Sequence, residues 1–157
     1  MDDVNFASRL AACANAIAAA GRKLGAQGLT PATSSNFSMR LDAAHIAITV
    51  SGRDKGALTA DDVMVADMHG KPVGTGARPS AETALHTQIY ARFPAANAVL
   101  HTHSRTQTVA SRLYAKAGMV RFDGYELQKA IAGHTSHEQA IDMPVFAKIL
   151  GGEMPAI

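Results

Sequence analysis

The sequence predicts a layered α/β or α+β domain with a mostly antiparallel sheet. An Ala-rich segment with apolar residues near helical spacing covers residues 3–25, and short alternating segments separated by turns follow over residues 37–68. From residue 80 onward, helical and extended patterns alternate. Such elements each bury one face, so they are expected to pack in layers. The length of 157 residues suits one domain of this kind.

The N-terminal half predicts one long helix and three strands. Gly25 and Gly28 end the Ala-rich helix, because glycine is common just after a helix C-terminus. Alternating side chains predict the strands, over residues 37–41, 45–50 and 63–68. The turn Asp42-Ala-Ala between the first two is typical of a hairpin. Thr59 can cap a single helical turn before the third strand.

The C-terminal half predicts helices that alternate with short strands. Pro79 and Ser80 begin a helix that runs to about Phe93, since proline suits the first helical turn. A short buried strand then ends at His101, and Ser104 can cap the helix that follows. The remaining predicted elements are helices over residues 105–116 and 124–132 and a last strand over 142–146.

The composition argues against several classes of protein. A formal net charge of +2 without a run of Lys or Arg does not predict nucleic-acid binding. Without an apolar run of bilayer length, no membrane partner is expected. The acidic start of the chain is unlike a secretory signal, and a lone cysteine, Cys13, fits a reducing compartment. A cytoplasmic location is therefore expected.

His101 and His103 are the most informative pair of residues. Residues two apart on an extended segment point to the same side, so both imidazoles can reach one cation. Neutral imidazole suits zinc and other first-row divalent ions. A catalytic zinc site normally has three protein ligands, so the pair alone does not complete one. Two hydrogen-bonded histidines in a turn are the alternative.

Glu82 and two polar loops offer further candidates. Glu82 lies at the start of a predicted helix and shares a helix face with His86, so its carboxylate could ligate, orient a ligand or transfer protons. It could also be an acidic residue favoured by the helix dipole. The loops over residues 33–36 and 51–56 carry the hydroxyl, amide and cationic donors that phosphate needs, although ordinary turns also use such residues.

A second group of polar residues lies near the C-terminal end. Glu126 and Lys129 are three apart on one face of a predicted helix, which usually indicates a surface ion pair. His134 and His137 follow closely. They could be metal ligands, but a polar cluster at a helix end is the simpler interpretation.

Six motifs in one order resemble the methylthioribulose-1-phosphate dehydratases, a family of the class II aldolase/adducin superfamily. They are Pro31-Ala-Thr-Ser-Ser-Asn-Phe-Ser38, Val50-Ser-Gly-Arg-Asp-Lys-Gly-Ala-Leu58, Arg78-Pro-Ser-Ala-Glu-Thr-Ala-Leu-His86, Val99-Leu-His-Thr-His-Ser104, Gly124-Tyr-Glu-Leu-Gln-Lys-Ala130 and Ala132-Gly-His-Thr-Ser-His-Glu138. The resemblance implies an α/β class II aldolase-like domain over residues 1–146. This domain would have three α/β/α layers around a mostly antiparallel sheet and would be C-terminally incomplete. Residues 147–157 would be a tail outside the family pattern.

The resemblance also implies an activity and its site. The family dehydrates 5-methylthioribulose 1-phosphate to 2,3-diketo-5-methylthiopentyl 1-phosphate in methionine salvage, as a homotetramer with one Zn²⁺ per subunit. His101 and His103 match two zinc ligands, Glu82 matches the carboxylate beside the metal, and Glu126 matches the general acid/base. An acid near neutral pH needs a raised pKa, so partial burial of Glu126 is expected. The positions expected to hold phosphate and hydroxyls are Asn36, Ser51, Gly52, Ser80 and Lys129.

Two departures from the family pattern keep other functions open. Ser35 replaces the usual glycine, so a positive φ there would be strained. The family's third zinc ligand, in a later Gly-His-Gly segment, has no counterpart here. Zinc binding would then need a further donor, chosen among Glu82, His86, His134 and His137. The alternatives are a sugar-phosphate class II aldolase or epimerase, and an inactive fragment or non-enzymatic assembly module.

Overall fold

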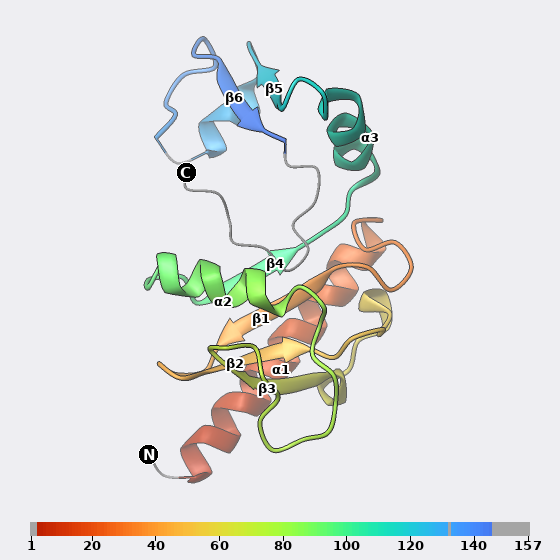
Figure 1. Ribbon diagram of the computed structural model, residues 1–157, viewed down its shortest axis with the longest axis vertical. Helices are drawn as coiled ribbons and strands as arrows, with labels where there is room; N and C mark the ends of the chain where they lie inside the picture. The colour runs from red at the N-terminus through yellow and green to blue at the C-terminus, as the bar shows by residue number, and fades with distance from the viewer. Residues whose placement is uncertain (1–2, 132, 146–157) are drawn as a thin grey trace. The chain divides into compact units, whose positions relative to one another are not determined.

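The computed structural model describes residues 3–131 and 133–145, which divide into two compact units at the boundary between Ser104 and Arg105 (Figure 1). The first unit contains α1 (Asp3–Ala26), β1 (Asn36–Arg40), β2 (His45–Thr49), the 3₁₀ turns η1 (Lys55–Ala57) and η2 (Ala60–Asp62), β3 (Val63–Asp67), α2 (Thr83–Arg92) and β4 (Ala98–His101). The long helix, the hairpin strands and the helical turn after Thr59 are confirmed.

The first unit is a three-layer domain around an antiparallel sheet. Its strands run in the order β3-β2-β1-β4, and each neighbouring pair is antiparallel. Helix α1 covers one face of the sheet and α2 the other (Figure 1). Alternation along β2 explains this arrangement, because Ala47 packs in the core with α1 whereas Ile46 and Ile48 pack with Tyr90 of α2. The predicted class II aldolase-like layering and mostly antiparallel sheet are confirmed.

Helix α2 begins later than its sequence predicts. It starts at Thr83, because Pro79 is drawn into an isolated antiparallel bridge with Val50. The Ser51 N–H also donates to the Arg78 carbonyl over 3.0 Å. These two contacts hold the segment before α2 against the end of β2, and this places the loop over residues 51–56 beside the start of α2.

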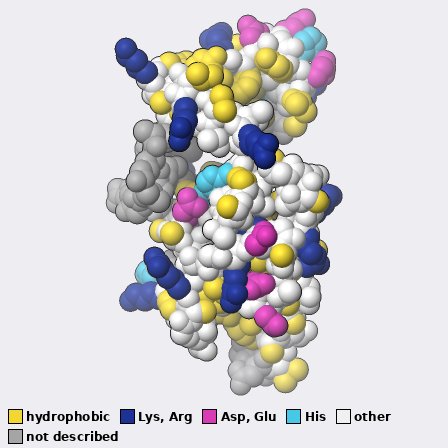
Figure 2. Space-filling model, turned by 90° about the vertical axis from the view of Figure 1, so that its right-hand side faces the viewer, with side chains coloured by type: hydrophobic (Ala, Val, Ile, Leu, Met, Phe, Trp, Pro, Cys, Tyr) yellow, Lys and Arg dark blue, Asp and Glu magenta, His cyan; other side chains and the backbone are white. Residues whose placement is uncertain are grey.

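The second unit is small and rich in exposed apolar side chains. It contains α3 (Arg105–Tyr114), β5 (Met119–Phe122), the 3₁₀ helix η3 (Glu126–Ala130) and β6 (Ile141–Pro144). The α-helix predicted over residues 124–132 is a five-residue 3₁₀ helix instead. Strand β5, which pairs antiparallel with β6, was not predicted. Figure 2 shows hydrophobic side chains on the surface of this unit, and on the face drawn there basic and acidic groups are interspersed.

Two predictions, the tail over residues 147–157 and the lack of a membrane partner, remain to be compared with the structure. The proposed tail lies outside the described residues. Among the helices that the structure does describe, none combines the length and the apolarity that a bilayer crossing requires.

Candidate metal centre

Two rows of polar side chains face each other between β1 and α2. Asn36 and Ser38 are alternate residues of β1, so they point to the same side of the sheet. Glu82, the residue before α2, is followed at helical intervals of four by His86 and Tyr90. Hydrogen bonds join the rows, since Asn36 Nδ2 donates to Glu82 Oε2 over 2.6 Å and Asn36 Oδ1 lies 2.5 Å from His86 Nε2.

The sheet register brings the two histidines to the same place. His101, the last residue of β4, is opposite Asn36 of β1. The imidazole rings of His101 and His103 are stacked, with centroids 4.7 Å apart. The His103 N–H donates to the Leu29 carbonyl over 2.9 Å, which fixes the segment after β4. The predicted side-by-side placement of the two histidines is confirmed.

Glu82, His101 and His103, which we call the metal group, could together hold a metal ion. One potential ligand atom from each lies within 4.8 Å of the others. His101 Nδ1 is 2.9 Å from Glu82 Oε2. This nitrogen atom is buried. Two imidazoles and a carboxylate are a suitable donor set for a divalent ion such as zinc.

The protonation of His101 also suits a metal ligand. Burial lowers the pKa of His101. The neighbouring Glu82 carboxylate raises this pKa, and the His103 ring lowers it. The imidazole is therefore neutral near pH 7, which is the form that binds a metal. Glu82 is thus a candidate for the third donor that the two histidines lacked in the sequence.

The other candidates for the third donor have different contacts. His86 uses both ring nitrogens, Nε2 with Asn36 and Nδ1 with Ser38 over 2.6 Å. It is fully buried and has no free nitrogen for an ion. His134 and His137 lie in the second unit, where His134 Nδ1 is buried and His137 Nδ1 is 3.2 Å from Glu126 Oε1. Within the first unit, Glu82 is thus the candidate that completes the group.

A pocket of about 330 Å³ opens beside the metal group. It is lined by Thr33, Ser34, Ser35, Asn36, Ser51, Gly52, Lys55, Ser80, Ala81, Glu82 and His103. All the expected substrate-holding positions of the first unit therefore share one cavity with two of the three possible metal ligands. Such a volume and polar lining suit a small hydrophilic molecule.

Lys55 is a pocket residue that we did not single out from the sequence. Its side chain is 2% exposed, and Nζ donates to the carbonyls of Thr33 and Arg53 over 3.1 and 2.6 Å. The ammonium group thus ties the two polar loops together. Burial lowers the pKa of Lys55, against the opposing effect of Asp54 and Asp62. The only sequence signal was a lysine in a glycine-flanked loop, which also suits an exposed turn.

Ser35 adopts the backbone conformation that the glycine of the family would favour. Its φ is 73°, in the left-handed region. The side chain is buried, and Oγ makes only a long contact of 3.4 Å with the Leu29 carbonyl. The conditional expectation of strain at this position is confirmed.

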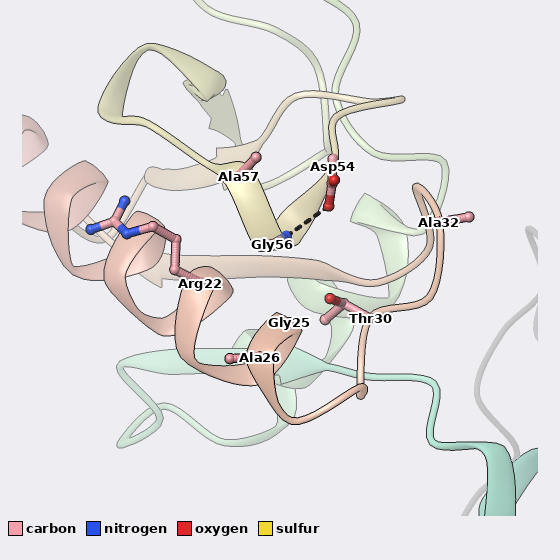
Figure 3. A pocket seen from close by; sticks show the side chains of 8 residues that line it. All are labelled: Arg22, Gly25, Ala26, Thr30, Ala32, Asp54, Gly56 and Ala57. Carbon is pink, nitrogen blue, oxygen red and sulfur yellow. Dashed lines mark hydrogen bonds between the residues drawn. The ribbon is translucent and has the colours of Figure 1, made fainter.

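Close contact between Gly25 and Gly56 sets the position of the loop over residues 51–56. A Cβ on Gly25 of α1 would lie 2.5 Å from the Cα of Gly56. Figure 3 shows these residues around a second concavity of about 480 Å³, in which Asp54 Oδ1 accepts the Gly56 N–H over 2.8 Å. The loop therefore rests on the helix backbone at Gly56, while the adjacent Lys55 lines the pocket at the metal group.

The remaining predicted residues, Glu126 and Lys129, lie in the second unit. They form the expected ion pair, with Lys129 Nζ 2.8 Å from Glu126 Oε2. The Glu126 side chain is 70% exposed, and its hydrogen bond with Lys129 lowers its pKa. The partial burial and raised pKa expected for an acid are therefore not found here. Glu126 is ionised at neutral pH, as a base would be.

Comparisons with known proteins agree with this fold. A family model described as Class II Aldolase and Adducin N-terminal domain matches residues 15–151. The chain is 64% identical over 126 residues to methylthioribulose-1-phosphate dehydratase of Xanthomonas campestris pv. campestris (strain 8004), covering 80% of this chain and 58% of that protein. The enzyme of the same name from Stenotrophomonas maltophilia (strain K279a) is 65% identical over 126 residues, with coverage of 80% and 59%.

Solved structures give the same result. The crystal structure of L-fuculose-1-phosphate aldolase from Thermus thermophilus matches with a TM-score of 0.59 at 31% identity, covering 78% of this chain and 57% of that chain. The chain spans just under three fifths of the length of these relatives. Because the family model covers most of its residues, the chain belongs to the class II aldolase and adducin N-terminal domain family.

Proposed function

We propose that this chain carries the metal and substrate site of a zinc-dependent dehydratase that converts 5-methylthioribulose 1-phosphate to 2,3-diketo-5-methylthiopentyl 1-phosphate in cytoplasmic methionine salvage. The observation that carries the proposal is the meeting of Glu82, His101 and His103 at a pocket lined by the polar loops. The dehydratases named above share 64–65% identity with the chain, which supports the choice of substrate.

The pocket loops would bind the phosphate and the hydroxyls of the substrate. Ser51 and Ser80 supply hydroxyl donors, and Gly52 supplies a backbone N–H beside them. The Lys55 ammonium adds positive charge, and with two of its three N–H donors used by carbonyls it retains one for an anion. Asn36 borders the same cavity next to Glu82 and would contact the sugar end of the substrate.

Zinc held by Glu82, His101 and His103 would supply Lewis-acid polarisation of the substrate carbonyl. We assign the proton transfers to Glu126. Its ionised carboxylate would accept the proton from C3, and the resulting acid would return it to the C4 hydroxyl, which leaves as water. The enol that remains then tautomerises to the diketone. Glu126 is ionised at neutral pH, which is the form that the first of these two steps needs.

The test is to incubate the zinc-loaded chain with 5-methylthioribulose 1-phosphate and identify the product by ¹³C NMR. Glu126→Gln is expected to lower the rate by at least about 100-fold, the lower range for general acid–base catalysis, and to leave the zinc content unchanged. The matched control is Glu138→Gln, which changes an exposed carboxylate of the same unit. Full activity in Glu126→Gln would remove this residue from proton transfer.

Metal analysis tests the centre separately. His101→Ala is expected to abolish zinc binding, because it removes one of the two assigned imidazole ligands, whose Nδ1 atom is buried. His45→Ala is the control, since His45 pairs with Asp42 in the hairpin turn. An unchanged zinc stoichiometry in His101→Ala would refute the assigned site.

An aldolase is the second candidate function. The match to L-fuculose-1-phosphate aldolase favours it, because aldolase and dehydratase chemistry both start at a polarised carbonyl. Product analysis separates the two, since cleavage of the carbon chain indicates an aldolase and an intact diketone indicates a dehydratase. Zinc binding without any product would instead favour a binding or assembly module.

We also propose that the chain associates with copies of itself, as a tetramer. Large apolar side chains of the second unit are exposed, among them Val109, Leu113 and Leu127. Exposed apolar groups in such number are typical of a surface that another protein surface covers. Sedimentation analysis of the purified chain measures this directly.

A further inference from the structure

Four hydrogen bonds connect Glu82 with the interior of the first unit. We call these five residues the relay, and in order they are Glu82, Asn36, His86, Ser38 and Tyr90. The successive donor–acceptor distances are 2.6, 2.5, 2.6 and 2.8 Å. The last four members are at most 2% exposed, so solvent does not compete for their polar atoms. The polar side-chain atoms of these four residues therefore find their hydrogen bonds within the protein.

The carboxylate at one end fixes the direction of every bond. An ionised Glu82 only accepts hydrogen bonds, so Asn36 must present its NH₂ group to it and its Oδ1 to His86. His86 then carries its proton on Nε2, which leaves Nδ1 as an acceptor for the Ser38 hydroxyl. Ser38 Oγ in turn accepts from the Tyr90 hydroxyl. All four donors thus point toward Glu82.

Burial keeps both titratable inner members in the form that the relay needs. It lowers the pKa of His86 to about 4, with a smaller contribution from His101, so the ring is neutral. Burial raises the pKa of Tyr90, and contacts with Ser38, Arg40 and the Val99 N–H offset this only in part, so the phenol keeps its proton. The Arg40 guanidinium lies 4.7 Å above the Tyr90 ring and holds it in place.

We propose that Ser38, His86 and Tyr90 are positioning residues that set the orientation of the Asn36 amide and, through it, of the Glu82 carboxylate. Without the Ser38 hydroxyl, His86 Nδ1 loses its hydrogen-bond donor, and the ring is held through Nε2 alone. The Asn36 amide, which accepts from Nε2, would then be held less firmly, and so would the Glu82 carboxylate to which it donates. The proposal rests on the proposed function only in taking Glu82 as a metal ligand.

The first test reads the tautomer of His86 in the metal-free full chain. The ¹⁵N chemical shifts of its imidazole are expected to show a neutral ring protonated on Nε2 at pH 7. A ring protonated on Nδ1, or an imidazolium, would overturn the proposal. This measurement involves neither zinc nor substrate, so its outcome is independent of whether the chain dehydrates anything.

The second test measures affinity for zinc alone. Ser38→Ala is expected to bind zinc about 10-fold more weakly, the lower range for residues that orient metal ligands. Tyr90→Phe removes only the last hydroxyl of the relay and is expected to give a smaller loss. The matched control is Thr87→Val, because this buried hydroxyl of α2 donates within its own helix, to the Ala84 carbonyl.

Two results of the second test are informative. Native zinc affinity in both relay variants would overturn the positioning role. Weaker zinc binding with the expected tautomer, in a chain that produces no diketone, would support the relay and refute the dehydratase. If Ser38→Ala does not fold, the tautomer of the native chain and the Tyr90→Phe affinity still decide the proposal.

Discussion

The buried imidazole of His86 makes the stability of the chain sensitive to mild acid. Burial, with a smaller effect of His101, lowers its pKa from 6.5 to about 4. Below pH 6.5 the unfolded chain binds a proton on this ring, whereas the folded chain stays neutral until about pH 4. The free energy of unfolding is therefore undiminished by this group above pH 6.5 and falls progressively as the pH drops toward 4.

The size of the effect follows from the two pKa values. The gap between 6.5 and about 4 amounts to about 3.5 kcal/mol, at about 1.4 kcal/mol for each tenfold ratio. A domain of this size is stable by only about 5–15 kcal/mol, so the loss is a substantial fraction. Asp42 and Asp62 have lowered pKa values and stay ionised above pH 4, so they add little in this range. His101 acts in the same direction as His86, because burial lowers its pKa too.

Urea denaturation at pH 7 and pH 4.5 provides the assay. The native chain should lose about 2–3 kcal/mol of unfolding free energy between these conditions. His86→Gln keeps an N–H donor near the position of Nε2 but cannot take up a proton, so it should lose clearly less. His69→Gln, at an exposed turn position, is the control and should behave like the native chain. Equal losses in the native chain and His86→Gln would refute the reasoning.

Two further predictions concern the loops around the pocket. Gly25→Ala should destabilise the chain by about 1–3 kcal/mol in urea denaturation, because its Cβ would come 2.5 Å from the Gly56 Cα. Gly76→Ala, with open space around its Cα, is the control, and equal effects of the two substitutions would contradict the close contact. Ser35→Gly should raise the stability by about 0.5–1 kcal/mol, since glycine relieves a left-handed backbone at some cost in unfolded-state entropy. A lower Tm of this variant would contradict the assigned strain.

Local patterns predicted the elements that form the first unit. The hairpin strands and the long helix followed from periodicity and turn residues, and the spacing of His101 and His103 predicted their shared orientation. The predicted start of α2 was wrong because Pro79, which suits a helix start, instead forms a bridge with Val50. Strand β5 was missed because its four residues, Met119–Phe122, are too few for a clear alternating pattern.

Long-range contacts account for what the sequence did not reveal about the site. The buried position of Lys55 depends on the approach of Gly56 to α1, which joins residues far apart in the chain. The sequence gives only a weak indication of the relay. Asn36 and Ser38 are two residues apart, as on one face of a strand, and His86 and Tyr90 are four apart, as on one face of a helix. Neither spacing shows which strand faces which helix, so the pairing became visible only from the fold.

The two parts of the proposed chemistry, binding of the metal and substrate and transfer of the proton, can fail independently. Glu82, His101, His103 and the pocket loops all lie in the first unit, so the proposed zinc site is built from that unit. The carboxylate proposed for proton transfer, Glu126, lies in the second unit and is exposed within it. A chain that binds zinc with native affinity but makes no product would therefore locate the defect at the proton-transfer group. Loss of zinc binding by Glu126→Gln would instead show that the centre draws on the second unit.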